Sequence, residues 1–487
     1  MDTVTNEPDP RRWRALAVTL GAGFMSLLDV SIVNVALPSM QSGLRASAGA
    51  VQWVVSGYAL AYGLTLVAGG RLGDALGRRR IFMFALAGFV LMSALAGAAS
   101  SMAWLVVARL LQGASAGLLT PQSSGLIQTM FQGAERGRAF GLLGATIGFS
   151  TAVGPVLGGL IIALFGTDTG WRWVFYVNVP IGVVALIFAA RLLPGEERRK
   201  IRIRTEIDFL GAALLGLAVV CVLFPVVQVE SGNFGTWWWL LPVAVALGYL
   251  FVRWEHRTVR QGRAPLLDVR LFTNTAGFSS GATIGMVYFC GFAGLFVVMA
   301  MFFQTGLHYT ALESGFAVTS FALGSAVSSA IAGRLVSRWG RRLTVGALGL
   351  VILGFALSGV AGLLAPGRSA GLWMAVPLLL AGIGGGAVIS PNITLTLENV
   401  PTRMAGAAGG ALQTGQRVGT AVGAALLVAA FHSGADSGDY QAGLAIAMGA
   451  AVVIISIALA LAIREFRGRR RCSVDENLSQ RSVISSQ

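Results

Sequence analysis

Fourteen apolar stretches, each long enough to cross a bilayer as a helix, constrain this sequence more than any other feature. A hydrocarbon core about 30 Å thick needs roughly 20 apolar residues per helix. Only 12% of the residues are charged, against about 25% in soluble proteins. We therefore predict an all-α polytopic membrane protein. The stretches cover approximately 15–37, 50–70, 81–100, 103–130, 138–163, 173–193, 207–228, 237–252, 276–304, 312–333, 342–364, 371–397, 405–431 and 440–463.

The basic residues test this helix count and give the chain an orientation. The 36 Lys and Arg residues produce a net charge of +15, which could suggest nucleic-acid binding. However, 31 of the 36 lie in the N-terminus, the C-terminal tail or the even-numbered connections between stretches. Basic residues concentrate in this way in cytoplasmic loops. We therefore expect a multi-pass protein of the plasma (inner) membrane with both termini cytoplasmic, and no nucleic-acid partner.

An internal repeat divides the chain into two halves. The segment 70–79 recurs as 333–342, and each copy joins the second and third helices of its half. Such repeats are typical of secondary transporters. We predict two pseudo-symmetric six-helix bundles with two helices inserted between them. The predicted units are an N-terminal tail (1–14), a first bundle (15–193), a linker (194–206), the inserted helices (207–252), a connector (253–275), a second bundle (276–463) and a disordered tail (464–487).

Four short segments carry charged, amide, glycine or proline residues at characteristic places in or beside the apolar stretches. They are 29–38 in the first stretch, 70–79 after the second, 105–113 in the fourth and 154–159 in the fifth. Together they resemble the motifs of the major facilitator superfamily, specifically its fourteen-helix drug:proton antiporter branch. The resemblance implies the two-bundle major facilitator fold and export of small molecules. Ala75, Ser150 and Ser337 depart from the residues usual in these motifs.

Asp29 and Arg109 are the charges that fall inside the spans of the first bundle. An ionisable residue within a span is costly and by default marks a functional site. At about 1.5 Å per residue, both lie roughly 10 Å from the outer edge. The arginine favours the charged carboxylate, whereas burial favours the neutral acid. We hypothesise that Asp29 and Arg109 form the proton-coupling site; the alternative is that Asp29 braces its helix through neighbouring amides.

Two glycine-containing segments are candidates for gating or helix packing. In segment 70–79, the acid and the arginines could join the two bundles and close the inner side, or the arginines could serve only topology. In the fifth stretch, proline and small residues predict a kink and close packing, and only the resemblance connects them with export. The candidate residues are Gly70, Asp74, Gly77, Arg78, Arg79, Gly154, Pro155, Gly158 and Gly159.

Aromatic and amide side chains within the spans are candidates for a substrate cavity, because such pockets suit bulky amphipathic ligands. Each could instead face lipid or pack between helices. Arg417 has no acid at matching depth in its bundle, so it is predicted to face the cavity or to clasp a neighbouring helix. Because carboxylates are few, we expect neutral, zwitterionic or monovalent substrates. The candidates are Asn34, Trp53, Tyr58, Tyr62, Gln112, Tyr288, Phe292, Phe296, Gln304, Gln413 and Arg417.

These features predict a secondary-active exporter that exchanges protons for small amphipathic compounds, acts as a monomer and needs no cofactor beyond the proton gradient. No Walker A pattern is present, so ATP is not the expected driver. The alternatives are an uptake symporter of the same fold, a channel and a membrane-embedded enzyme. An enzyme or metal site would need a cluster of ligands, but His256, His308 and His432 are far apart in sequence and are expected in loops.

Overall fold

The computed structural model describes residues 10–166, 168–195, 208–227, 234–435 and 438–485. All regular structure in these ranges is helical. The first half contains α1 (Arg12–Gly43), α2 (Ala48–Leu76), α3 (Arg78–Gly97), α4 (Met102–Met130), α5 (Gly133–Phe165), α6 (Gly170–Tyr176) and α7 (Asn178–Leu192). The middle contains α9 (Phe209–Val227), α10 (Phe234–Trp237), α11 (Leu240–Arg260) and α12 (Arg270–Asn274). The second half contains α13 (Phe278–Ala300), η1 (Met301–Gly306), α14 (Ala311–Trp339), α15 (Arg341–Leu364), η2 (Gly367–Ser369), α16 (Ala370–Thr396), η3 (Thr402–Met404), α17 (Ala405–Ala435) and α18 (Tyr440–Ser485).

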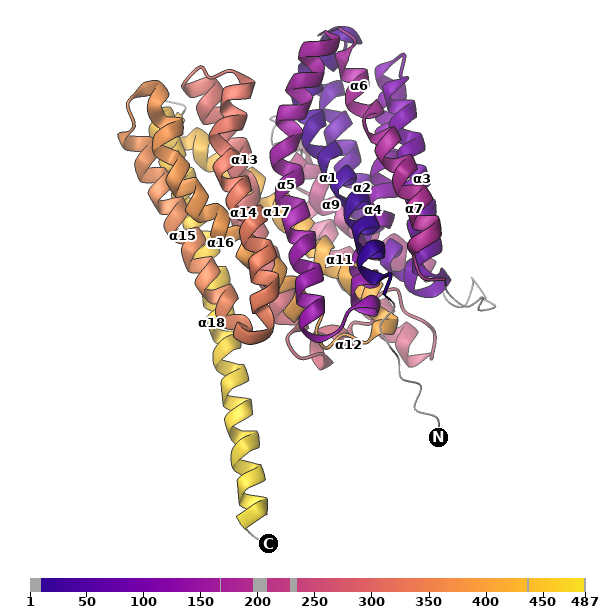
Figure 1. Cartoon of the computed structure of the whole chain (residues 1–487). Helices are drawn as coiled ribbons and strands as arrows, with labels where there is room; N and C mark the ends of the chain where they lie inside the picture. The colour runs from indigo at the N-terminus through magenta and orange to yellow at the C-terminus, as the bar shows by residue number, and fades with distance from the viewer. Residues whose placement is uncertain (1–9, 167, 196–207, 228–233, 436–437, 486–487) are drawn as a thin grey trace.

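The long helices form two bundles that stand side by side (Figure 1). Helices α1–α7 make the first bundle and α13–α18 the second, as the repeat predicted. The seam between the bundles is formed mainly by α5 against α14 and by α2 against α17. Helix α9 packs on α2 and α17, and α11 packs on α9. The inserted helices therefore cover the seam on the side away from the viewer in Figure 1.

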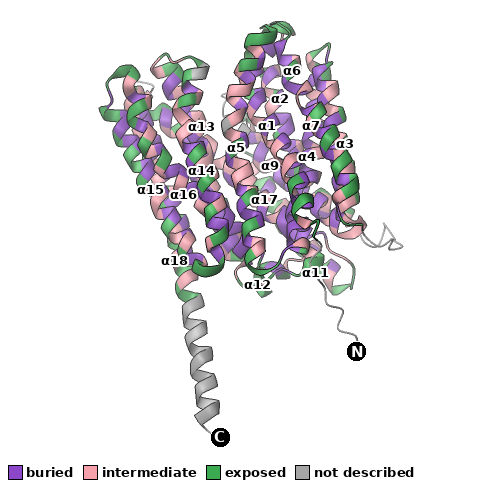
Figure 2. Ribbon diagram, viewed as in Figure 1, coloured by how far each residue is buried: buried purple, intermediate pink, exposed green. Residues whose placement is uncertain are grey.

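The outer faces of both bundles are apolar and exposed, as a bilayer requires. Buried residues gather on the inward faces of the helices, and exposed residues lie around the outside (Figure 2). Large apolar side chains on the outer faces include Phe84, which is 71% exposed, and Leu372, which is 81% exposed. Exposed apolar patches of this extent are rare on monomeric soluble proteins. The chain is thus an all-α polytopic membrane protein.

Thirteen helices within the described ranges are long and apolar enough to cross a membrane. The one predicted stretch not among them is the eighth, 237–252, which lies for most of its length in α11; charged residues in the last turns of α11 lower its hydropathy. Helix α11 runs antiparallel to α9. Near one end of this hairpin the Trp237 ring contacts Phe224, and at the other the indole of Trp254 donates to Asp208. The pairing makes α9 and α11 one hairpin; the sequence predicted the two inserted helices but not their pairing.

Three predicted boundaries differ from the structure. The sixth stretch is broken between α6 and α7, because Pro180 can donate no hydrogen bond to the carbonyl of Tyr176. Helix α11 continues to Arg260, so the connector is partly helical. The tail was predicted to be disordered, but α18 extends to Ser485, since this segment contains no proline and prolongs a helix that the span has already nucleated. Most of the linker, 196–206, lies outside the described residues.

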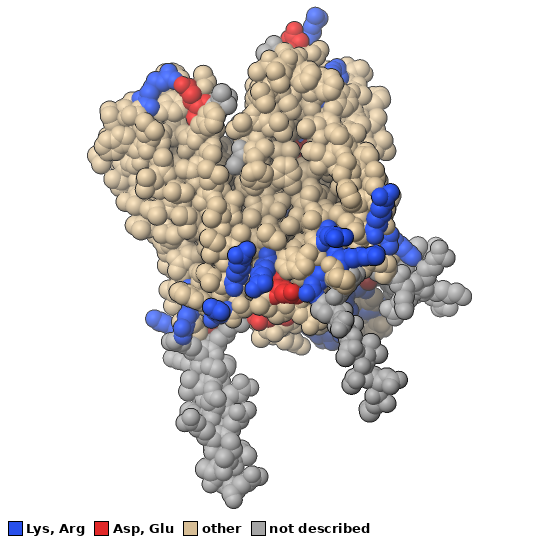
Figure 3. Space-filling model, in the orientation of Figure 1, with Lys and Arg blue, Asp and Glu red and all other residues tan. Residues whose placement is uncertain are grey.

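The two bundles meet most closely at one end, and α5 also contacts α14 farther along, where Gly148 faces Ala326. Figure 3 shows Lys and Arg side chains gathered at the end where α1 begins, which we call the basic end. There, a methyl group on Gly70 would lie 2.1 Å from the carbonyl oxygen of Gly406, and one on Gly141 would lie 2.9 Å from the Cα of Gly333. At the opposite end a hollow separates the bundles (Figure 3). The structure is therefore closed at the basic end and open at the other.

Candidate functional site

Asp29 lies within α1 and has no accessible surface. Its side chain accepts hydrogen bonds from two other helices. Arg109 Nη1 of α4 lies 2.5 Å from Oδ2, while Gln112 Nε2 of α4 and Asn178 Nδ2 of α7 lie 3.0 Å and 2.9 Å from Oδ1. A buried carboxylate is tolerated only when it is paired and hydrogen-bonded in this way. The sequence placed Asp29 and Arg109 at matching depth, and the structure brings them into direct contact.

Arg109 is held by more than its acid. Its Nε donates to the carbonyl of Val54 on α2 at 3.1 Å, and Nη1 also donates to Gln112 Oε1 at 2.8 Å. The guanidinium lies 4.2 Å from the centre of the Tyr58 ring, within the range of a cation–π contact. The arginine therefore connects α1, α2 and α4. A change of charge at Asp29 would alter the contacts of all three helices.

Asn178 is a functional candidate that the sequence reasoning missed. It is fully buried and also donates to Ser93 Oγ at 3.1 Å. The break before α7 places this residue at the first position of that helix, facing Asp29. A lone amide inside an apolar span was the available signal, because buried amides need partners. Its partner is 149 positions away in the chain, and spacing alone could not identify it.

Two tyrosines of α2 continue the contacts from Arg109 to the second bundle. The rings of Tyr58 and Tyr62 are stacked with centroids 6.1 Å apart. The guanidinium of Arg417 on α17 lies 4.5 Å from the centroid of the Tyr62 ring, and the Tyr62 hydroxyl donates to Thr120 at 2.9 Å. We call Arg109, Tyr58, Tyr62 and Arg417 the arginine–tyrosine ladder. It joins the buried ion pair to the seam.

The remaining predicted cavity residues of the first bundle and of α17 lie at different places. Gln413 Nε2 donates across the seam to Ser124 Oγ at 3.1 Å, one helical turn from Arg417. Asn34 is exposed. Trp53 is 36% exposed and contacts Phe224 of α9. The structure thus gathers Tyr58, Tyr62, Gln112, Gln413 and Arg417 near the seam, and leaves Asn34 and Trp53 outside that group.

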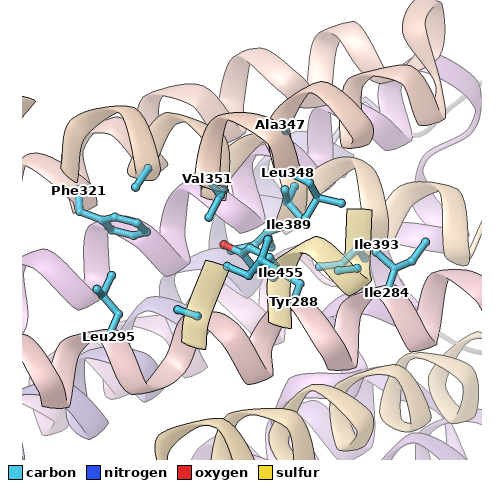
Figure 4. Close-up of a cluster of buried hydrophobic side chains, with 14 of the residues drawn as sticks. Ile284, Tyr288, Leu295, Phe321, Ala347, Leu348, Val351, Ile389, Ile393 and Ile455 are labelled. Carbon is cyan, nitrogen blue, oxygen red and sulfur yellow. The ribbon is translucent and has the colours of Figure 1, made fainter. Parts of the chain in front are cut away.

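The second bundle holds an aromatic cluster, formed by Tyr288, Phe292, Phe296 and Phe321. Phe292 stacks between Tyr288 and Phe321, with centroid distances of 5.5 Å and 5.4 Å. Tyr288 is 1% exposed and lies in the core beside Ile389 and Ile455 (Figure 4). Its predicted place on a cavity wall is therefore corrected to the core, where its largely apolar ring packs. The sequence reasoning missed Phe321, and Gln304 is exposed in η1.

The last turn of α2 and the start of α3 join the two bundles at the basic end. Both oxygens of Asp74 accept backbone hydrogen bonds from the first turn of α17, from Gly406 at 3.0 Å and Ala407 at 2.8 Å. An acid at a helix N-terminus is stabilised by the unpaired amides and the helix dipole. Arg78 pairs with Asp74 at 2.8 Å and donates to the carbonyl of Thr402 at 2.5 Å. Gly77 has φ of +103° and turns the chain from α2 into α3.

The other predicted motif residues act within the first bundle or at its edge. Arg79 donates to the carbonyl of Ala190 on α7. A methyl group on Gly154 or Gly158 would lie 2.4 Å or 3.0 Å from α1 side chains, whereas one on Gly159 would meet nothing within 4 Å. Helix α5 runs unbroken through Pro155. Gly154 and Gly158 therefore allow α5 to pack on α1, and Gly159 takes no part in that contact.

The second copy of the loop motif makes a different connection. Arg341, which aligns with Arg78, pairs with Glu465 of α18 at 2.9 Å and donates to Asn392 at 2.7 Å. Both partners belong to the second bundle. Ser337 stands where the first copy has Asp74, and it is exposed. The first copy thus forms hydrogen bonds across the seam, whereas the second copy reaches the first bundle through the close packing of Gly333 against Gly137 and Gly141 of α5.

Comparison with known proteins identifies the family. The sequence profile of the Major Facilitator Superfamily matches residues 19–424. The chain belongs to the major facilitator superfamily. It is 36% identical over 428 residues to the "Probable actinorhodin transporter" of Streptomyces coelicolor. This alignment covers 86% of this chain and 72% of that protein. It is 38% identical over 428 residues to "Puromycin resistance protein pur8" of Streptomyces alboniger, covering 86% of this chain and 82% of the relative.

A solved structure supports the fold of this superfamily member. The "proton:xylose symporter XylE" superposes with a TM-score of 0.67, covering 93% of this chain and 95% of that one, at 14% sequence identity. At this identity the likeness concerns the fold alone. The relatives in sequence are transporters or resistance proteins, so transport of small molecules is the activity of the family to which the chain belongs.

The three histidines, His256, His308 and His432, lie away from Asp29 in the sequence. His256 and His432 were expected in loops, but they lie on exposed faces of α11 and α17, because each continues the helix beyond its apolar part. Only His308 is in a loop. Within the described ranges, no three His, Cys, Asp or Glu side chains form a group that could hold a metal ion.

Two acids that the sequence reasoning missed, Asp208 and Glu255, lie at the base of the inserted hairpin. Glu255, in the last turns of α11 beyond its apolar part, has no accessible surface and accepts a backbone hydrogen bond from Leu266 at 3.2 Å. Burial and the negative charge of Asp208 raise the pKa of Glu255 to about 8. In the sequence, Glu255 is followed closely by the segment 264–269. The burial of Glu255 depends on how that segment folds back on α11, which the sequence pattern does not show.

Proposed function

We propose that this chain is a proton-coupled exporter that expels small amphipathic compounds, including antibiotics, in exchange for protons. The observation that carries the proposal is the buried pair of Asp29 and Arg109. A charged group at this depth is expensive to keep in place. This cost is offset if the charge changes during the transport cycle. The carboxylate of Asp29 can change its charge in this way, because it can bind a proton.

In the proposed cycle, protonation of Asp29 removes the ion pair with Arg109. Arg109 keeps its contacts with Val54 and Gln112, but its charge is no longer compensated. The ladder through Tyr58 and Tyr62 extends this change toward the seam. The bundles would then favour a different relative position, and loss of the proton would restore the pair.

We assign the basic end to the cytoplasm, because basic residues prefer cytoplasmic loops. The described state then faces outward, and Asp74 and Arg78 hold its inner side closed through the first turn of α17. The protein would lie in the plasma (inner) membrane with both termini cytoplasmic and act as a monomer. The membrane potential supplies about 2.3 kcal/mol per charge for each 100 mV, so one proton per cycle can sustain a large substrate gradient.

Transport by inside-out membrane vesicles tests this proposal. The vesicles are energised by respiration, and a fluorescent weak base reports the acid interior. Addition of puromycin or an aromatic quinone antibiotic should partly collapse the pH gradient, and the compound should accumulate inside. Vesicles without the protein are the control. Accumulation that requires the opposite pH gradient would show an uptake symporter, and accumulation that is indifferent to the gradient would exclude proton coupling.

A further inference from the structure

Arg417 is a cation within the apolar zone of α17. It is the thirteenth residue of a helix that begins at Ala405 near the basic end, which places it about 18 Å along the helix axis at 1.5 Å per residue. The hydrogen bond from Gln413, one turn earlier, to Ser124 shows that this face of α17 looks toward the first bundle. Arg417 therefore points to the seam and not to lipid.

The charge of Arg417 is not neutralised by a carboxylate in the part of the chain that the structure describes. None of the ion pairs there includes Arg417, and its contact is the face of the Tyr62 ring. Asp29, the buried acid at the end of the ladder, is paired with Arg109 and not with Arg417. The ladder thus carries one positive charge in excess. A cation at this depth is costly unless water or an anion compensates it.

The geometry around Arg417 suits an organic anion. The guanidinium carbon lies 4.5 Å from the centroid of the Tyr62 ring, so a cation–π contact holds the group at the seam. A guanidinium binds a carboxylate through two parallel hydrogen bonds. The residue is partly exposed, and the bundles are separated by a hollow at the end opposite the basic end (Figure 3). Part of the Arg417 side chain is therefore accessible to a ligand.

We propose that Arg417 is the recognition point for an acidic group on the substrate, so that the transported compounds include organic anions. This inference rests on the proposed function, because it names the substrate class of the exporter. It has a consequence for energetics. Export of a monoanion in exchange for one proton moves two elementary charges across the membrane in the same electrical sense. Export of the acid should then depend more steeply on the membrane potential than export of its neutral ester.

Binding to purified protein tests the site independently of transport. The probes are anthraquinone-2-carboxylate and its methyl ester, which differ only in the charged group, and tryptophan quenching reports binding in gluconate buffer. Wild-type protein should bind the acid more tightly than the ester. Arg417→Gln should weaken acid binding at least about tenfold, since a charge-assisted hydrogen bond contributes that much, and should change ester binding less than about twofold. Arg417→Lys should be intermediate.

Matched controls separate a local effect from a folding defect. Arg368→Gln removes an arginine from an exposed ion pair with Glu313. This variant should leave the affinities for the acid and the ester unchanged. Retained ester binding shows that Arg417→Gln is folded. Equal loss of acid and ester binding, or no loss of either, would overturn the proposal. It would also be overturned if chloride alone changed the fluorescence and the acid did not compete with it.

One further variant distinguishes this inference from the proposed function. Asp29→Asn should lose proton-driven transport and still bind the acid more tightly than the ester. If transport proves independent of protons while Arg417→Gln loses only acid binding, the coupling proposal fails and the anion site stands. If proton coupling holds and the acid and ester bind equally in wild type, the anion site fails.

Discussion

The interior of the first bundle joins its helices through an ion pair, whereas the interior of the second joins them through aromatic rings. Asp29 and Arg109 connect α1 with α4, while Phe292 and Phe321 connect α13 with α14. Ring contacts depend little on protonation. An ion pair is lost when its acid is neutralised. The two bundles therefore share a fold but place their ion pairs differently: among the described residues, the Asp29–Arg109 pair of the first bundle lies deep within its spans, whereas that of the second, Arg341 with Glu465, lies where α15 begins.

The two copies of the loop motif differ in the same direction. The first copy bonds to the opposite bundle through Asp74 and Arg78, and the second bonds within its own bundle through Arg341 and Glu465. The repeat thus preserves the turn and the arginine but not the partner. We infer that the first bundle carries both the proton site and the lock at the basic end.

The largest expected effect comes from breaking the ion pair. Arg109→Gln leaves Asp29 buried without its cation, which typically costs about 3–5 kcal/mol, so we expect a large fall in thermal stability and loss of transport. Tm in detergent and vesicle transport measure these effects. The double variant Asp29→Asn with Arg109→Gln should regain most of the stability and none of the proton-driven transport. Equal Tm values for the single variant and wild type would contradict this interpretation.

The next effect concerns closure at the basic end. Gly70→Ala would place a methyl group 2.1 Å from the carbonyl oxygen of Gly406, and overpacking of this kind costs about 1–3 kcal/mol. We expect the closed state to be depopulated, with faster hydrogen exchange in the first turn of α17. Gly159→Ala is the matched control, because nothing lies within 4 Å of its added methyl group. Slower or unchanged exchange in Gly70→Ala would refute the contact's role.

Neutralising Asp74 of the first motif copy and Glu465, the acid that pairs with Arg341 of the second copy, should have unequal consequences. Asp74→Asn loses charge-assisted hydrogen bonds to α17, worth about 1.5–3 kcal/mol each, and should open the seam. Glu465→Gln should destabilise the second bundle and leave the seam closed. A cysteine introduced near the basic end, at Ala75, reports opening by its rate of labelling. Equal labelling rates in the two variants would remove the distinction between the copies.

The smallest predicted effect is a pH dependence at the inserted hairpin. The pKa of Glu255 is raised from 4.5 to about 8, so between these values the folded protein holds a proton that the unfolded chain lacks. Stability should therefore fall as pH rises through this window. Glu255→Gln should flatten the change of Tm over that range. Glu313→Gln, at an exposed acid that pairs with Arg368, should leave this range unaffected, and an unaltered slope in Glu255→Gln would count against the assignment.

The sequence predicted the features that depend on local pattern and on the repeat. Apolar length predicted the helices, and depth predicted the contact between Asp29 and Arg109. Tyr288 was misplaced, because an aromatic residue in a span has the same pattern whether it faces the core or a cavity. Asn178 and the order of the ladder could not be predicted. Both depend on the placement of helices that are remote in sequence, such as α2 against α17, and periodicity carries no information on that placement.

The central claim, that Asp29 is the coupling proton site, is tested most directly by comparing two modes of transport in reconstituted vesicles. Exchange of labelled for unlabelled substrate needs no net proton movement, whereas accumulation against a gradient does. Asp29→Asn should retain exchange and lose accumulation driven by a pH gradient, because the site for the proton is absent while the substrate path remains. Accumulation by Asp29→Asn at the wild-type rate would contradict the account.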